Sequence, residues 1–242
     1  AGHDLNYCSY AGIIKTVGNS QSAVGSRQSP QPAIPNFQIS DIVGGSLDAA
    51  MGILAALIHQ KTSGEGQYVD VSIFDGVLAH SVTALAHLKS IENFGVDTSG
   101  MLNGALHCYS IYETKDARYI ALGALEFKFW QRFCEAIDRD DLVSRHMAMG
   151  EDSQKVFKEL NALFMSKTLA QWTAHFKDVD CCVSPVLSLQ ETMKNEQVRA
   201  RNIVITKEHP SEGEVIQFGL PIKFSSFEFE VEKHAPLHGE HT

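Results

Sequence analysis

The sequence predicts a mixed α/β fold, and two observations lead to this prediction. An apolar helix, a glycine turn, an alternating strand and a second helix follow one another over residues 42–92, the order of a layered α/β unit. After residue 103 the pattern changes to a short hairpin followed by amphipathic helices. We therefore expect a layered α/β part and a separate, smaller α+β module.

In the first part, residues 5–14 favour a short helix, and residues 18–35 favour a loop because they are rich in Ser, Gln, Gly and Pro. Ser40 or Asp41 is expected to cap the next helix, since a short oxygen-bearing side chain accepts from free backbone N–H groups. Apolar residues cover nearly every face of residues 42–60, which predicts a buried helix. The elements expected after it are a turn over 63–67, a strand over 68–73 and a helix over 74–92.

In the second part, residues 114–117 are expected to turn a β-hairpin. Its two strands are residues 107–113 and 119–122. Three short amphipathic helices are predicted over residues 127–137, 153–165 and 169–176. The chain then continues through residues 183–187, a helix over 191–200 and a strand-like stretch over 215–224.

Composition and charge exclude several classes of protein. The net charge is −9 without a Lys/Arg cluster, which argues against nucleic acid or an anionic membrane as the partner. Asp48 and His59 interrupt the longest apolar run, so we expect no membrane-spanning helix. Five cysteines without CxxC spacing indicate reduced thiols in an intracellular protein, and no metal site is expected.

Four acid–base side chains stand out: His3, Asp4, Asp41 and Glu126. A histidine and carboxylates that converge on one carbon are what proton abstraction beside a carbonyl requires. Each also has a structural explanation. The pair His3–Asp4 fits a solvated turn, Asp41 fits a helix cap, and Glu126 fits the positive end of a helix dipole.

Six segments of the chain resemble the class III CoA-transferase (CaiB/BaiF) superfamily. They are residues 1–7 (AGHDLNY), 41–45 (DIVGG), 64–72 (GEGQYVDVS), 123–126 (GALE), 185–187 (PVL) and 239–242 (GEHT). The first segment and the GALE segment are most similar to the α-methylacyl-CoA racemase branch. The resemblance covers essentially the whole chain in order.

The resemblance implies roles for these residues. His3 matches the catalytic histidine and Asp41 the catalytic aspartate, with Asp4 and Glu126 as supporting acids. The residues expected to bind substrate are Tyr7, Gly44, Gly45, Asn103 and Gly104. The substrate would be a 2-methyl-branched acyl-CoA thioester, inverted at its α-carbon through an enolate, with CoA as part of the substrate and no other cofactor. Backbone N–H groups at the start of the Asp41 helix are the expected donors to the enolate oxygen.

The resemblance also implies an architecture: a partial Rossmann-like large domain plus a smaller α+β domain, in an interlocked homodimer where Glu126 serves the other subunit's His3. The expected parts are residues 1–85 (large domain, with His3 and Asp41), 86–109 (linker), 110–190 (small α+β domain) and 191–242 (return to the large domain). The compartment stays open between mitochondrion, peroxisome and bacterial cytoplasm.

Two other interpretations remain. In a CoA-transferase, Asp41 would be a nucleophile that forms acyl-anhydride and aspartyl-CoA intermediates. Alternatively the chain is a non-catalytic truncated product, because family members begin with a nucleotide-binding segment that is not in this sequence.

Overall fold

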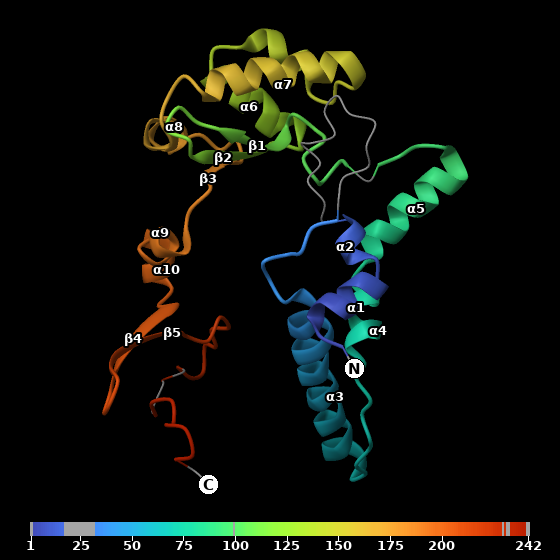
Figure 1. Ribbon diagram of the computed structural model, residues 1–242, viewed down its shortest axis with the longest axis vertical. Coiled ribbons are helices and arrows are strands. Elements are labelled where there is room, and N and C mark those ends of the chain that lie inside the picture. The colour runs from blue at the N-terminus through green and yellow to red at the C-terminus, as the bar shows by residue number, and fades with distance from the viewer. Residues whose placement is uncertain (1, 17–31, 99, 229, 231–232, 241–242) are drawn as a thin grey trace. The chain divides into compact units, whose positions relative to one another are not determined.

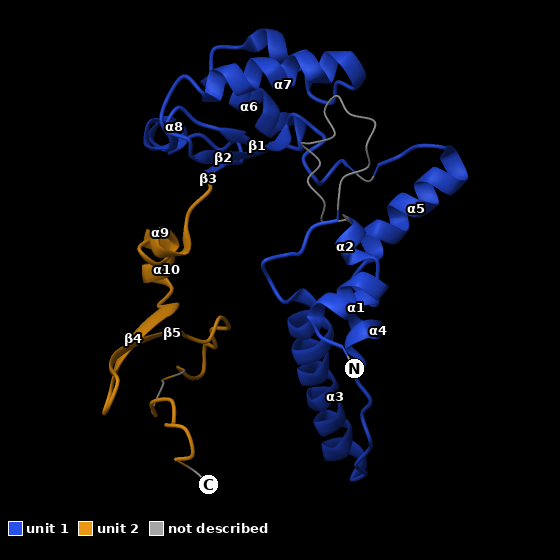
Figure 2. Cartoon of the chain, viewed as in Figure 1, with its two compact units in different colours: residues 1–184 blue, residues 185–242 orange. Residues whose placement is uncertain are grey.

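The structure is a computed structural model that describes residues 2–16, 32–98, 100–228, 230 and 233–240. It divides into two compact units, residues 1–184 and 185–242 (Figure 2). Most of the predicted loop over 18–35 lies outside the described residues. The mixed α/β fold is confirmed.

The helices of residues 2–98 precede any described strand of the chain. They are α1 (Asp4–Tyr10), α2 (Ile13–Thr16), η2 (Ser40–Leu47), α3 (Asp48–Ser63), α4 (Ile73–Ala79) and α5 (Val82–Phe94). The predicted helix over 42–60 is thus longer, and its first part, η2, has the wider π-helical turn. α5 runs to Phe94, so the expected linker from residue 86 begins inside a helix.

Helices η2 and α4 cross with their backbones in contact. A Cβ on Gly44 would lie 2.8 Å from Val77 N and also against the Ile73 carbonyl oxygen. On the other side, a Cβ on Gly76 would lie 2.9 Å from the Gly44 carbonyl oxygen. Only glycines permit so close a crossing. Gly44 therefore lies directly against the α4 backbone.

The expectation that the 42–60 helix is buried is wrong for this chain. α3 has no buried residue, and Leu54 and Ile58 are 61% and 66% exposed. The segment after the helix covers one strip of it, where Val69 and Val71 lie against Gly52 (Figure 1). No other described element of residues 2–98 covers the remaining apolar face, so within this part of the chain a helix with a core-like composition lies open.

The predicted strand over 68–73 is also not formed. Residues 65–72 are irregular, and α4 begins at Ile73 with the Ser72 hydroxyl accepting from Asp75 N at 3.2 Å. A strand needs a neighbouring strand to bond its N–H and C=O groups. The described residues before position 98 offer none, so the alternating pattern has no ladder to join.

η2 and α3 together, Ser40–Ser63, are long and apolar enough by length and composition to cross a membrane. The expectation that Asp48 and His59 rule out such a helix was therefore wrong in those terms. Asp48 Oδ2 nevertheless faces Gly76 of α4, at the helix crossing. Length and composition alone are weak grounds for a membrane span.

Residues 106–183 form the α+β module, and the buried core cluster of the described chain lies within it. Its elements are β1 (Tyr109–Glu113), β2 (Tyr119–Gly123), α6 (Phe127–Ala136), η3 (Asp140–Arg145), α7 (Gly150–Phe164), α8 (Leu169–Phe176) and β3 (Val183–Pro185). β1 and β2 pair antiparallel with Ile111 opposite Ala121, as the predicted hairpin requires, and the sheet order is β1-β2-β3. α6 and α7 pack over the sheet (Figure 1).

The core begins earlier than the predicted domain start at residue 110. Leu106, His107 and Cys108, assigned to the linker, are all buried in it. The His107 ring Nε2 lies 2.9 Å from the Arg145 carbonyl oxygen, so it donates there, and Nδ1 then accepts from the Ser153 hydroxyl at 3.2 Å. Burial lowers the pKa of His107, and the nearby charges of His146 and Arg145 add to this.

The second unit contains α9 (Leu189–Met193), α10 (Glu196–Ala200), β4 (Val204–His209) and β5 (Gly213–Phe218). β4 was not predicted. It pairs antiparallel with β5, in which Thr206 lies opposite Ile216, so the strand-like stretch expected over 215–224 is one half of a hairpin and ends at Phe218. The unit begins at residue 185, whereas the return segment was expected from residue 191.

Candidate active site

His3 occupies the N-cap position of α1, with an extended backbone. Its main-chain N–H donates to Asn6 Oδ1 at 3.0 Å, and its carbonyl accepts from Asn6 N at 2.8 Å. The backbone is therefore fixed. The imidazole ring is exposed; it takes part in a capping box with the Asn6 main chain, and it forms no ion pair with any residue that the structure describes.

Asp4, the next residue, joins α1 to η2. Its Oδ1 accepts from Ser40 N at 2.7 Å, from the Ser40 hydroxyl at 2.6 Å and from Asp41 N at 3.1 Å. The first N–H groups of a helix have no partner within it, and here a carboxylate from a distant segment supplies one. The structure thus gives Asp4 a structural role between the two segments.

The surroundings of Asp4 keep it ionised. Burial raises its pKa, but the bonds from the Ser40 hydroxyl and from the Asp41 and Ser40 N–H groups outweigh burial, and the net pKa is lowered. The Cys8 thiol, buried beneath it, donates to Oδ2 at 3.6 Å. Asp4 therefore stays a carboxylate and is suited to holding the helix start.

Asp41 contrasts with Asp4. Its main chain is held at both ends, by N–H donation to Asp4 and by a bond from the Ser46 hydroxyl to its carbonyl at 3.1 Å. Its carboxylate is exposed and has no hydrogen-bond or ion-pair partner among the residues that the structure describes. A fixed backbone with a free carboxylate suits a general base, a general acid or a nucleophile.

The predicted capping of this helix is wrong. The N-cap position belongs to Ile39, and the Ser40 hydroxyl donates to Asp4 and not along its own helix. The expected enolate donors are also wrong. The N–H groups of Ser40 and Asp41 bond Asp4, and that of Ile42 bonds the Gln38 carbonyl at 3.1 Å, so none is free for an enolate oxygen.

Glu126 lies in the α+β module, at the N-cap position of α6. Its carbonyl accepts from Phe129 N and Trp130 N, and its exposed carboxylate makes no hydrogen bond within the described part of the chain. Burial raises the pKa of the Cys182 thiol, and the Glu126 charge raises it further. No hydrogen bond joins Glu126 to His3 within this chain.

The predicted substrate-binding residues are spread over three elements. Tyr7 is half-buried on α1, with its ring over Gly2. Gly44 is buried against α4, whose backbone fills the space beside its Cα. Beside Gly45 there is space for a side chain, since the nearest atom, Ile73 Cγ1, lies 3.4 Å from where a Cβ would be. Asn103 and Gly104 lie in the turn before β1, in which Asn103 N donates to the Gly100 carbonyl and Gly104 has φ +86°.

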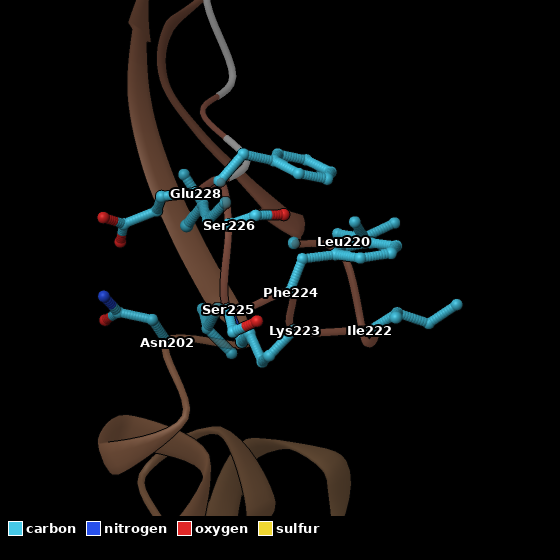
Figure 3. Close-up of a pocket in the computed structure, with 12 residues that line it drawn as sticks. Asn202, Leu220, Ile222, Lys223, Phe224, Ser225, Ser226 and Glu228 are labelled. Atoms are coloured by element: carbon cyan, nitrogen blue, oxygen red, sulfur yellow. The ribbon is translucent and has the colours of Figure 1, made fainter.

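A cavity of about 660 Å³ lies elsewhere, in the second unit (Figure 3). It is lined by Asn202, by β4 and by the segment that follows β5, and its labelled residues include Asn202, Lys223, Phe224 and Glu228. None of the predicted site residues lines it. Among the residues that the structure describes, no cluster of three or more His, Cys, Asp or Glu side chains could hold a metal ion.

Ser40 and Cys8 are the residues of this site whose roles the sequence analysis missed. Both are fully buried around Asp4. A serine before an aspartate resembles an ordinary helix cap, and a contact across 36 positions leaves no periodic pattern in the sequence. Neither role could be found without coordinates.

The sequence profile of CoA-transferase family III matches residues 1–242. The chain belongs to CoA-transferase family III. Human alpha-methylacyl-CoA racemase is 29% identical over 244 residues, which are 100% of this chain and 60% of the human protein. A formyl-CoA:oxalate CoA-transferase of Rhodopseudomonas palustris (strain BisA53) is also 29% identical, over 96% of this chain and 60% of its own length.

Solved structures agree on the fold of this family III chain. Rv3272 from Mycobacterium tuberculosis superposes with a TM-score of 0.74 at 22% identity, over 99% of this chain and 62% of Rv3272. A CaiB/BaiF family protein from Brucella suis gives a TM-score of 0.71 at 18% identity, over 100% of this chain and 61% of that protein. The chain thus spans about 60% of the length of these relatives.

Proposed function

We propose that this chain carries the acid–base pair of a racemase that inverts the α-carbon of 2-methyl-branched acyl-CoA thioesters. The supporting observation is the Asp4 contact. It bonds the residue after His3 to the main chain of Asp41, while the imidazole and the Asp41 carboxylate are both exposed and form no ion pair with the described residues. Two different acid–base groups on neighbouring, fixed backbones suit a two-base inversion.

In the proposed reaction, one of His3 and Asp41 removes the α-proton of the thioester and leaves an enolate. The other group returns a proton to the opposite face of the planar carbon. The first group ends protonated and the second deprotonated, so the reaction balances and can run in either direction. The only cofactor in this scheme is the CoA of the substrate.

The proposal includes an interlocked homodimer, in which Glu126 of one subunit hydrogen-bonds His3 of the other and fixes its tautomer. The exposed, unbonded Glu126 carboxylate is consistent with this arrangement. So is the open apolar face of α3, since a face of this kind is usually covered in the assembled protein. We place the protein inside the cell, without choosing a compartment.

The test is solvent deuterium exchange. The natural full-length protein, given a single enantiomer of a 2-methylacyl-CoA in D₂O without an acceptor acid, should exchange the α-hydrogen and form both epimers. Exchange followed by NMR and epimer composition followed by chiral chromatography measure the two events separately. Loss of optical activity without deuterium incorporation would contradict an enolate route.

The second candidate is a CoA-transferase, and the free Asp41 carboxylate favours it equally because a nucleophile must be unbonded. The R. palustris relative bears the name of such an enzyme at the same identity as the human racemase. What favours the racemase is His3, whose ring is exposed beside Asp4. Hydroxylamine trapping of an acyl group on Asp41, with an acceptor acid present, would support the transferase.

The non-catalytic interpretation predicts a third outcome. If the natural protein at full length neither exchanges the α-hydrogen nor forms a trappable acyl group, both enzymatic proposals fail. Binding of acyl-CoA without turnover, measured by calorimetry, would then be the remaining activity to seek.

A further inference from the structure

Ser40 is the most enclosed polar residue beside the proposed site. It is 0% exposed, whereas its neighbour Asp41 is exposed. Both its main-chain N–H and its hydroxyl reach the same oxygen, Asp4 Oδ1, at 2.7 and 2.6 Å. A buried hydroxyl with a charged partner is a specific arrangement, because an unpaired one would be unfavourable there.

The direction of the hydroxyl bond follows from its distances. Ser40 Oγ lies 2.6 Å from Asp4 Oδ1 and 3.1 Å from the Asp4 carbonyl oxygen. The hydroxyl has a single proton, and the shorter contact to the ionised oxygen takes it. Among the described residues, Oδ1 therefore accepts from three donors and Oδ2 from the Cys8 thiol alone, at 3.6 Å, which fixes the rotation of the carboxylate.

Among these donors, only the hydroxyl depends on which residue occupies position 40. The N–H groups of Ser40 and Asp41 would remain with alanine there. The backbone contact can therefore survive without the hydroxyl, but the carboxylate would lose its shortest bond. The contact between the two segments thus does not require the Ser40 hydroxyl, although the hydroxyl makes the shortest bond to Asp4.

We propose that Ser40 is a positioning residue, whose hydroxyl, acting through Asp4, sets the separation of His3 on α1 from Asp41 on η2. The inference rests on the proposed function, since it assigns Ser40 to the same acid–base pair. The pair is sensitive to this contact because His3 precedes Asp4 and Asp41 follows Ser40 directly. A small rotation of Asp4 would therefore change the positions of the His3 and Asp41 side chains relative to the planar α-carbon of the enolate.

The experiment compares Ser40→Ala with Ser9→Ala in the natural full-length protein. Ser9 is the matched control because its hydroxyl also makes a 2.6 Å bond, but to the Leu5 carbonyl within α1. Misplacement of reacting groups by a fraction of an ångström lowers the rate steeply, so Ser40→Ala should reduce kcat for α-hydrogen exchange about 10- to 100-fold with KM nearly unchanged. Ser9→Ala should match the wild type in both constants.

A pH profile separates positioning from mere stabilisation. Because the Ser40 hydroxyl lowers the pKa of Asp4, its removal should move the acid limb of kcat to higher pH, and Ser9→Ala should not. If Ser40→Ala does not fold, Ser40→Cys fills the same space with a weaker donor and should show the same fall in kcat.

Two failures are distinguishable. A wild-type protein that exchanges no α-hydrogen refutes the proposed function. A wild type that exchanges, with a folded Ser40→Ala or Ser40→Cys protein of equal kcat and an unmoved acid limb, refutes the positioning role alone.

Discussion

Gly44 and Gly76 lie back to back where η2 crosses α4, so close that a methyl group on either would touch the other helix. The crossing holds η2, and with it Asp41, against α4 while α1 approaches from Asp4. The position of the Asp41 carboxylate thus depends on two contacts, one polar and one formed by glycines.

The glycine contact can be tested with neighbouring substitutions. Gly44→Ala should destabilise residues 2–98 by about 1–3 kcal/mol, because its Cβ meets the α4 backbone and the helices must separate. Gly45→Ala is the control: its Cβ would make ordinary contact with Ile73 at 3.4 Å, and it should be neutral or slightly stabilising. Amide hydrogen exchange of η2 and α4 measures both, and equal protection in the two variants would contradict the crossing.

Loss of either proposed acid–base group should stop inversion without unfolding the protein. His3→Ala removes an exposed ring, and Asp41→Asn changes an exposed carboxylate that has no partner among the described residues, so melting temperatures should hardly change. The rate of α-hydrogen exchange should fall at least about 10²–10⁴-fold. Wild-type turnover in either variant would refute the two-base assignment, whereas Glu126→Gln should reduce the rate less because Glu126 is proposed to orient His3 and not to transfer the proton.

Asp4 should stabilise the helix start above its unfolded pKa and cease to do so in acid. Its folded pKa is lowered below the ordinary value of 3.8, so its contribution is present above that pH and is lost as pH falls through the lower folded value. Asp4→Ala should cost about 1–3 kcal/mol at neutral pH through the lost bonds. Protection of the Ser40 and Asp41 amides measures this. A difference from wild type that persists unchanged below the folded pKa would contradict it.

As the pH is lowered, the α+β module should begin to lose stability at a higher pH than residues 2–98 do. Burial lowers the pKa of His107 from 6.5, so its contribution is present above 6.5 and is lost as pH falls through the folded value. His107→Gln should have a flatter pH dependence, and His59→Gln, on the exposed α3, should behave as wild type. Both tryptophans, Trp130 and Trp172, are buried in this module, so their fluorescence reports its unfolding.

The sequence predicted those elements whose partners lie nearby in the chain. The hairpin around residues 114–117 and the amphipathic helices α6, α7 and α8 were found because each pairs or packs within a few dozen residues. The strand over 68–73 and the burial of α3 were wrong for the opposite reason. Their patterns indicate a strand neighbour and a covering layer that the described chain does not supply.

For the site, the sequence identified the reactive groups but not what holds them. His3, Asp41 and Glu126 were recognised by their residue types and by resemblance, and their catalytic roles stay predictions. The bonds of Asp4 to Ser40 and Asp41 could not be predicted, because hydrogen bonds between segments 36 residues apart follow from packing and not from local pattern.

The exposed apolar face of α3 has a practical consequence for the purification of this protein. Three exposed apolar residues of α3 face water: Leu54, Leu57 and Ile58. They lie beside residues 65–72, whose backbone is not paired in a sheet, and this combination promotes self-association of the protein. The purified protein should therefore form concentration-dependent aggregates that are detected by light scattering. Mild detergent, or lysines introduced along that face, should disperse them.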